Sequence, residues 1–235
     1  MSLAAKIEAT KALLRQIESD YAPATFANSF GAEDMVLTDL IAKVAPRIEV
    51  FSLDTGRLHG ETYKLMAQTR ERYGNLTFKA YYPNAAAIED FVNTNGINAF
   101  YNSVEMRKKC CGIRKVEPLK RALAGKKAWI TGLRREQAVS RTTLQAQETD
   151  KDNGLEKFSP LADWTQKDVW DYIKENQVPY NELHDRNFPS IGCEPCTRAI
   201  AVGEDVRAGR WWWENPETKE CGLHPVDGKL VRAAK

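Results

Sequence analysis

The sequence predicts an α/β protein whose twisted, mostly parallel sheet is flanked by helices. Short apolar segments with the character of strands alternate with helical patterns along most of the chain. Polar or glycine-containing loops follow these strands directly. Because ligands of parallel α/β sheets bind at the carboxyl ends of the strands, these loops are the first candidates for a functional site.

The elements are expected in a regular order. Apolar residues at helical spacing predict a leading helix over residues 3–18. Strands are predicted at residues 24–27, 48–53, 76–82 and 128–131. The helices that alternate with these strands are predicted at residues 35–44, 60–73, 85–93 and 116–124.

The remaining segments have weaker patterns. Residues 98–105 are predicted to be irregular, and residues 142–156 to form a polar, mobile loop. A short extended piece is expected at residues 158–161. Thr165 stands three residues before Asp168, and this capping-box pattern predicts the start of a further helix.

Length and composition limit the organisation and the class of partner. The 235 residues suit an α/β ligand-binding domain over residues 1–200 and a separate C-terminal segment over residues 201–235. A formal net charge of +2 argues against a dedicated nucleic-acid or membrane-surface binder. No apolar run is long enough to span a membrane and no signal-peptide pattern is present, so we expect a cytoplasmic protein.

Three loops at strand ends carry candidates for binding an anion. Residues 28–34 join the first strand to a helix N-terminus, where unpaired amides favour anions, and Ser29 and Gly31 would line this turn. The alternative is an ordinary tight connection with a helix cap, since the loop holds a single glycine. The second strand ends in the polar residues 54–59, and the fourth ends in the basic loop of residues 132–141.

The five cysteines point to metal or thiol chemistry, because an odd number cannot close a disulfide framework. Cys193 and Cys196 form a C-x-x-C pattern, which zinc sites, redox dithiols and iron–sulfur sites share. Cys110 and Cys111 are adjacent, and adjacent side chains diverge on either a helix or a strand. Bringing both sulfurs to one small zinc ion would therefore be strained. A cubane iron–sulfur cluster is larger and offers a separate iron atom to each cysteine sulfur. We therefore predict that these four residues ligate a [4Fe–4S] cluster, the alternative being ordinary buried thiols.

The fifth cysteine, Cys221, stands alone near the end of the sequence. A catalytic thiol needs cationic neighbours that favour the thiolate. His224 follows it by three positions, and Arg207 and Arg210 precede it. These two arginines are three apart and would share one face of a helix. The alternative is a tail cysteine that is exposed to solvent and has no role.

Six motifs together resemble one family. They are SFGAED at residues 29–34, LDTGR at 53–57, CCGIRK at 110–115, TGLRR at 131–135, GCEPC at 192–196 and ECGLH at 220–224. The sequence resembles the assimilatory adenylyl-sulfate (APS) reductases of the iron–sulfur type, within the 3′-phosphoadenylyl-sulfate (PAPS) reductase family. The first motif is similar to the pyrophosphate loop of N-type ATP pyrophosphatases, which implies an adenine nucleotide alpha hydrolase-like fold.

The resemblance implies reduction of adenylyl sulfate to sulfite and AMP in sulfate assimilation. The Cys221 thiolate would attack the sulfate sulfur and form a cysteine S-sulfonate, which a separate thioredoxin or glutaredoxin would then reduce. Lys115 and His224 would assist the reaction. The residues expected to bind the substrate are Ser29, Gly31, Asp34, Leu53, Thr55, Arg57, Gly132, Arg134, Arg141, Arg207 and Arg210.

Three alternatives remain open at this point. A PAPS reductase, or an enzyme that accepts both nucleotides, shares the fold and the Cys221 motif, but the two cysteine pairs favour the APS type. An RNA-thiolating enzyme would require a more ATP-like loop and a strongly basic surface. A zinc-stabilised binding module is disfavoured because Cys110 and Cys111 are adjacent. The sequence leaves open whether the protein is a homo-oligomer.

Overall fold

The computed structural model describes residues 1–137 and 142–215. The chain divides into two compact units, which we describe separately. The expected division into residues 1–200 and a separate segment 201–235 stays a prediction, because most of that segment lies outside the described residues. Unit 1 contains Met1–Ser52, Gly60–Lys79 and Leu123–Glu182, and unit 2 contains Leu53–His59, Ala80–Ala122 and Leu183–Lys235.

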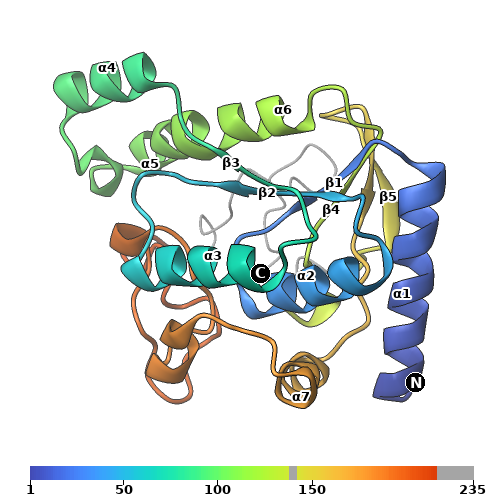
Figure 1. Ribbon diagram of the computed structural model, residues 1–235. Coiled ribbons are helices and arrows are strands. Elements are labelled where there is room, and N and C mark those ends of the chain that lie inside the picture. The colour runs from blue at the N-terminus through green and yellow to red at the C-terminus, as the bar shows by residue number, and fades with distance from the viewer. Residues whose placement is uncertain (138–141, 216–235) are drawn as a thin grey trace. The chain divides into compact units, whose positions relative to one another are not determined.

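A six-stranded sheet in the order β3-β2-β1-β4-β6-β5 forms the framework of the fold (Figure 1). β1 pairs in parallel with β2 and with β4, and β4 pairs in parallel with β6. β5 pairs with β6 in the antiparallel sense. The prediction of a mostly parallel α/β sheet is therefore confirmed. The strands are β1 Ala24–Ala27, β2 Glu49–Leu53, β3 Phe78–Tyr81, β4 Ala128–Ile130, β5 Gln147–Asp150 and β6 Leu155–Phe158.

Helices α1, α2, α3 and α7 of unit 1 pack their apolar faces with the strands into its core. α2 packs against both α1 and α7, and Figure 1 shows α2 and α3 on the same side of the sheet. Met35 and Leu37 of α2 are completely buried. Thr165 and Asp168 form the predicted capping box at the start of α7. The helices are α1 Leu3–Asp20, α2 Ala32–Val44, α3 Gly60–Arg72 and α7 Gln166–Asn176.

A buried carboxylate also links these helices. Asp39 of α2 accepts hydrogen bonds from the hydroxyl groups of Tyr73 at 3.1 Å and Tyr172 at 2.6 Å. Lys43 pairs with the same carboxylate at 2.6 Å. Because every partner is a donor, Asp39 satisfies its charge inside the unit and has a structural role.

The prediction of a polar, mobile loop over residues 142–156 is wrong for its second half. Residues 147–158 form the β5–β6 hairpin, which turns at Gly154 with a φ of 68°. Asp150 accepts a hydrogen bond from the buried indole of Trp129 at 3.0 Å, and Glu148 pairs with Lys157 at 2.6 Å. A strand at the edge of a sheet needs few apolar residues, so polar side chains concealed this hairpin from pattern analysis.

Unit 2 carries a chain of short helices between residues 85 and 122. The prediction that residues 98–105 are irregular is partly wrong, because Ala99–Tyr101 forms a 3₁₀ turn and α5 begins at Val104. Ser103 caps α5 by accepting a hydrogen bond from the Met106 amide at 3.1 Å. The elements are α4 Ala85–Asn95, α5 Val104–Cys111, a π-helical turn Gly112–Val116 and α6 Glu117–Leu123.

The expectation that Arg207 and Arg210 share a helix face is wrong. Residues 201–210 form turns and no helix. Arg210 instead pairs with Thr197 in an isolated antiparallel bridge. Arg207 and Arg210 therefore do not lie together on one face of a helix.

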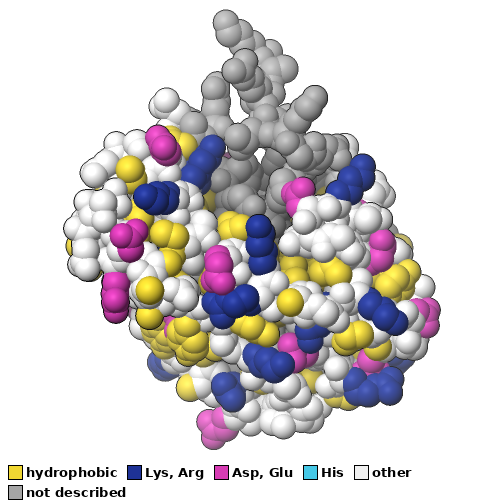
Figure 2. All heavy atoms as spheres, turned by 90° about the horizontal axis from the view of Figure 1, so that it is seen from above, with side chains coloured by type: hydrophobic (Ala, Val, Ile, Leu, Met, Phe, Trp, Pro, Cys, Tyr) yellow, Lys and Arg dark blue, Asp and Glu magenta, His cyan; other side chains and the backbone are white. Residues whose placement is uncertain are grey.

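The visible surface carries charge of both signs. On the face drawn in Figure 2, Lys and Arg side chains are interspersed with Asp and Glu. Positive charge available to an anionic ligand must therefore be gathered locally. No described helix combines the length and the apolar character needed to cross a membrane.

Candidate functional site

The four predicted cluster cysteines come together around one pocket in unit 2. Cys110 and Cys111 lie at the C-terminal end of α5, and Cys193 and Cys196 flank a 3₁₀ turn. All four line the same pocket, whose empty volume, including space open to solvent, is about 400 Å³. Cys193 and Cys196 are buried, whereas Cys110 and Cys111 are partly exposed.

Backbone pairing fixes the C-x-x-C turn. Leu58 forms an antiparallel bridge with Cys193, and the Glu194 amide donates to the Arg57 carbonyl at 2.8 Å. The Cys196 amide donates to the Cys193 carbonyl at 2.9 Å and closes the turn. The segment after β2 thus holds the second cysteine pair in place, although more than a hundred residues separate them in sequence.

The environment of Cys193 favours its thiolate. Burial opposes ionisation of this thiol, but the Lys115 ammonium and the Thr55 hydroxyl outweigh that effect and lower its pKa below the ordinary value. Arg114 and Arg210 act in the same direction. The Thr55 Oγ1 atom lies 3.2 Å from the Cys193 Sγ atom. Thr55, predicted to bind substrate, is therefore a partner of a cysteine.

Two other thiols, those of Cys196 and Cys110, have raised pKa values. Burial raises the pKa of Cys196 to about 12, and the neighbouring Cys193 adds to the rise. Burial also raises the pKa of Cys110. Without a positively charged group to bind them, these thiols would remain protonated near neutral pH.

An ion pair lies beneath the pocket and was not predicted from the sequence. Arg107 of α5 donates to both carboxylate oxygens of Glu214, at 2.8 Å and 2.7 Å, and only 1% of the Arg107 side chain is exposed. Its guanidinium lies 4.6 Å from the centre of the Trp211 ring, and that of Arg210 lies 4.8 Å from the same centre. This arrangement fixes the turn of residues 210–214 against the cysteine helix.

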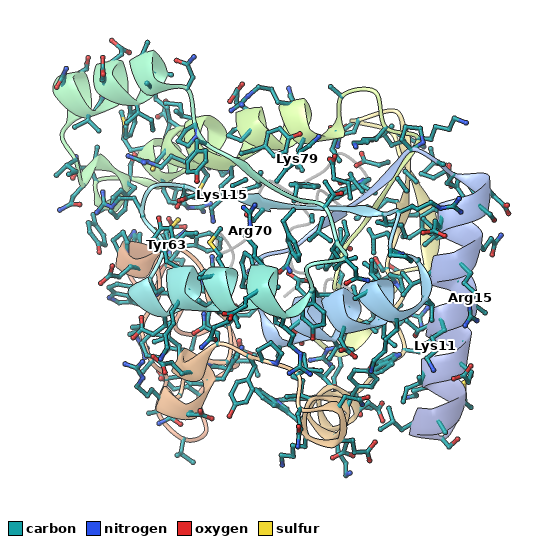
Figure 3. The ribbon with its side chains drawn as sticks, viewed as in Figure 1. Lys11, Arg15, Tyr63, Arg70, Lys79 and Lys115 are labelled. Carbon is teal, nitrogen blue, oxygen red and sulfur yellow. The ribbon has the colours of Figure 1, made fainter. Side chains whose placement is uncertain are left out.

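The structure also locates the cations that were predicted in this unit. Lys115, labelled in Figure 3, lines the cysteine pocket from the π-helical turn. Arg57 lines it too, but its guanidinium donates to the Ile97 carbonyl and the Asn98 side chain, each at 3.0 Å. Arg57 thus orders the segment before α5. Arg114 also lines the pocket and donates to the Thr55 carbonyl at 2.6 Å. It was not among the predicted site residues.

The four thiols are the side chains at this pocket that could hold a metal group. Among the described residues, no three His, Cys, Asp or Glu side chains converge as the ligands of one metal ion would. Four thiols around a single pocket, with cationic side chains beside them, fit a larger group that each sulfur reaches separately.

The strand-end loops of unit 1 form a second candidate region. The exposed Ser29 donates its amide and its hydroxyl to the buried Asp34 carboxylate, at 2.7 Å and 2.6 Å. The Gly132 amide, after β4, donates to the same carboxylate. Arg134 lies deeper and pairs with Glu33 and Glu136, at 2.9 Å each. The predicted residues Ser29, Asp34 and Gly132 are therefore brought together, whereas Arg134 is engaged internally.

Gly132 is expected to tolerate no side chain. A Cβ atom there would lie 2.1 Å from the Asp34 Oδ1 atom and 3.2 Å from the Glu33 Cβ atom. Gly132→Ala should lower the free energy of unfolding by about 1–3 kcal/mol, because the hydrogen-bonded Asp34 cannot move aside. Chemical denaturation measures this. Gly74→Ala, where nothing lies within 4 Å, is the matched control, and equal effects of the two substitutions would contradict the prediction.

Three predicted residues, Cys221, His224 and Arg141, lie outside the described residues. Leu53 ends β2, Gly31 is the N-cap of α2 and Arg207 lies in the turns of residues 201–210, and their substrate role stays a prediction.

The sheet order and the strand-end loops define an α/β protein of the adenine nucleotide alpha hydrolase-like class. A structural relative at low identity is the FMN adenylyltransferase of Candida glabrata with FAD and pyrophosphate, at a TM-score of 0.57 and 16% identity, covering 96% of this chain and 81% of that one. Phosphoadenylyl-sulfate reductase from Candida auris, in a phosphate complex, gives a TM-score of 0.70 at 29% identity over 81% of this chain and 90% of its own.

Sequence comparison narrows this class to one family. Residues 23–199 match the phosphoadenosine phosphosulfate reductase domain, and the chain belongs to that family. An adenosine 5′-phosphosulfate reductase of Allochromatium vinosum is 56% identical over 221 residues, covering 94% of this chain and 84% of the relative. The protein of that name from Burkholderia cepacia is 56% identical over 222 residues, covering 94% and 88%. The predicted PAPS reductase family is confirmed, and the iron–sulfur type stays a prediction.

Proposed function

We propose that this protein reduces adenylyl sulfate to sulfite and AMP in sulfate assimilation. The observation that carries the proposal is the pocket that gathers Cys110, Cys111, Cys193, Cys196 and Lys115. Relatives named adenosine 5′-phosphosulfate reductase, at 56% identity, support the choice of substrate. A PAPS or dual-specificity reductase is the alternative, and the ratio of kcat/KM for the two nucleotides decides between them.

The proposed reaction has two stages. In the first, the Cys221 thiolate attacks the sulfate sulfur, the bond from that sulfur to the phosphate oxygen breaks, and AMP leaves with the bonding electron pair. The enzyme now carries a cysteine S-sulfonate. In the second, a thiolate of thioredoxin or glutaredoxin attacks Sγ of Cys221 and expels sulfite. The second thiol of the reductant then resolves the mixed disulfide, so the dithiol supplies both electrons.

Positive charge must offset the approach of a thiolate to a sulfate anion. Lys115 lies at the cysteine pocket, and Arg207 and Arg210 are carried by the turns that precede the Cys221 segment. We assign these three side chains to the phosphosulfate, and the backbone of Ser29, Gly31 and Gly132 to the nucleotide. The same substrate role is proposed for Leu53, Thr55 and Arg141, and His224 is proposed to support the Cys221 thiolate.

We further propose that Cys110, Cys111, Cys193 and Cys196 hold a [4Fe–4S] cluster. When bound, the cluster would supply local charge beside Lys115, whereas the reducing equivalents arrive as thiols. The high thiol pKa of Cys196 fits this proposal, since Lys115 and Arg210 do not offset its burial and binding to iron would stabilise the thiolate directly. A reductant in the cytoplasm would complete the cycle.

Anaerobic purification followed by iron and sulfide assays tests the cluster, and adenylyl sulfate with a radiolabelled sulfate group tests the reaction. We expect about four irons per chain, label retained on the protein after denaturation, and release of the label as sulfite when reduced thioredoxin is added. A colourless protein that contains zinc and takes up no label would overturn the assignment.

A further inference from the structure

The strand-end loops of unit 1 contain an anion of their own. Asp34 is 8% exposed, and its carboxylate accepts the Ser29 amide, the Ser29 hydroxyl and the Gly132 amide. Two loops that are far apart in sequence therefore converge on one carboxylate. Among the described residues, the groups that stabilise the Asp34 charge most are these neutral donors of Ser29 and Gly132.

The direction of the Ser29 hydroxyl is decisive. A carboxylate can only accept, so the Ser29 O–H group must point to Asp34 and present lone pairs to solvent. Ser29 is exposed, and an oxyanion that approached it would meet an acceptor and a second negative charge. If Asp34 carried a proton, its own O–H could donate to Ser29, and the Ser29 hydroxyl would be released to donate outward.

We propose that Asp34 is a positioning residue that couples nucleotide binding to the uptake of one proton, because its carboxylate occupies the donors that the nucleotide's oxyanion needs. This inference depends on the proposed function for the identity of the ligand. It also revises the expectation that Asp34 binds substrate directly, since an ionised carboxylate would repel the phosphosulfate.

Burial agrees with this coupling. Burial raises the pKa of Asp34 to about 6, the Ser29 hydrogen bonds oppose the rise, and the neighbouring Glu33 adds to it. Glu33 is itself paired with Arg134, which also bonds Glu136. Arg135 of the loop after β4 pairs instead with Asp163, and Arg141 of that loop lies outside the described residues. An anionic ligand would raise the pKa further, so binding should draw a proton from solvent at neutral pH.

The sign of the pH dependence follows directly. The protonated form binds the nucleotide better, so full affinity is present below about pH 6 and is lost as the pH rises. The loss can reach, but not exceed, about tenfold for each pH unit while one proton is coupled. Adenylyl sulfate is the suitable probe, because its phosphosulfate group does not titrate in this range.

The test is isothermal titration calorimetry of adenylyl sulfate binding to protein that carries Cys221→Ser, which prevents turnover. Runs in two buffers of different ionisation enthalpy count the protons taken up. We expect net uptake and an affinity that weakens at least about fivefold between pH 6 and pH 8. With Asp34→Asn added, uptake should vanish and the affinity should exceed that of the parent at pH 8, since the amide can donate to Ser29.

Two further variants separate this idea from a general structural effect. Asp39→Asn changes a buried carboxylate of the same helix whose partners are Tyr73, Tyr172 and Lys43, and it should leave proton uptake intact. Ser29→Ala should remove most of the gain that Asp34→Asn brings. Equal uptake in the parent and the Asp34→Asn protein would overturn the inference while the proposed function stands. No binding of adenylyl sulfate by the parent would overturn both.

Discussion

Replacing Cys221 with serine is expected to abolish sulfite formation. A serine hydroxyl is far less ionised than a cysteine thiol near neutral pH and is the poorer nucleophile, and loss of a covalent nucleophile lowers kcat by about 10⁴-fold or more. The variant should also fail to retain label from adenylyl sulfate, because no S-sulfonate can form. The measurement is sulfite release with reduced thioredoxin in excess, together with the labelling assay described above.

The control for this prediction is the iron content and the substrate binding of the Cys221→Ser protein. Cys221 is not one of the four cysteines proposed to hold the cluster, so Cys221→Ser should keep the iron content of the unchanged protein and should still bind adenylyl sulfate. Cys193→Ser, in contrast, removes a proposed ligand and should lose iron. Label that stays on the Cys221→Ser chain would show that another residue is the nucleophile.

Replacing Arg107 with methionine is expected to cause the largest loss of stability. The change leaves the Glu214 carboxylate buried without its guanidinium, and only 2% of the Glu214 side chain is exposed. Breaking a buried ion pair on one side lowers the free energy of unfolding by about 3–5 kcal/mol. Denaturant unfolding followed by tryptophan fluorescence measures the effect, since Trp211 stacks on Arg107.

A matched control is available on the next helix. Arg121 forms an exposed pair with Glu117 one helical turn away, so Arg121→Met should change stability by less than about 1 kcal/mol. Adding Glu214→Gln to Arg107→Met should restore part of the loss, because the uncompensated charge disappears. Similar losses for Arg107→Met and Arg121→Met would contradict the assigned role of the buried pair.

Local patterns predicted most of the elements because their causes are local. The capping box of Thr165 and Asp168 and the completely buried β4 are each encoded within a few residues. The β5–β6 hairpin was missed because its partner, Trp129, lies about twenty residues away and its own side chains are polar. α5 was not predicted, because Ser103, its cap, stands in a polar stretch.

The grouping of the four cysteines was predicted from the sequence, but the buried ion pair that supports their helix was not. The spacing of the cysteines indicated a common ligand set, and the structure brings all four to one pocket. The buried roles of Arg107 and Glu214 could not be predicted, since a basic run and a charged tail look solvated in sequence. Asp34 lies in the predicted strand-end loop, but its hydrogen bonds from Ser29 and Gly132 could not be predicted, since the sequence does not show which donors a carboxylate meets.

The Arg107–Glu214 pair also has a consequence for biosynthesis. The two residues are 107 positions apart, and Thr55 and Cys193 are 138 apart, so these contacts close only after most of the chain has left the ribosome. A nascent chain that ends before Glu214 would hold Arg107 without its counter-charge beside unpaired thiols. The cysteine pocket is therefore completed late in translation, and the proposed cluster would be inserted into the nearly finished chain rather than into an early intermediate.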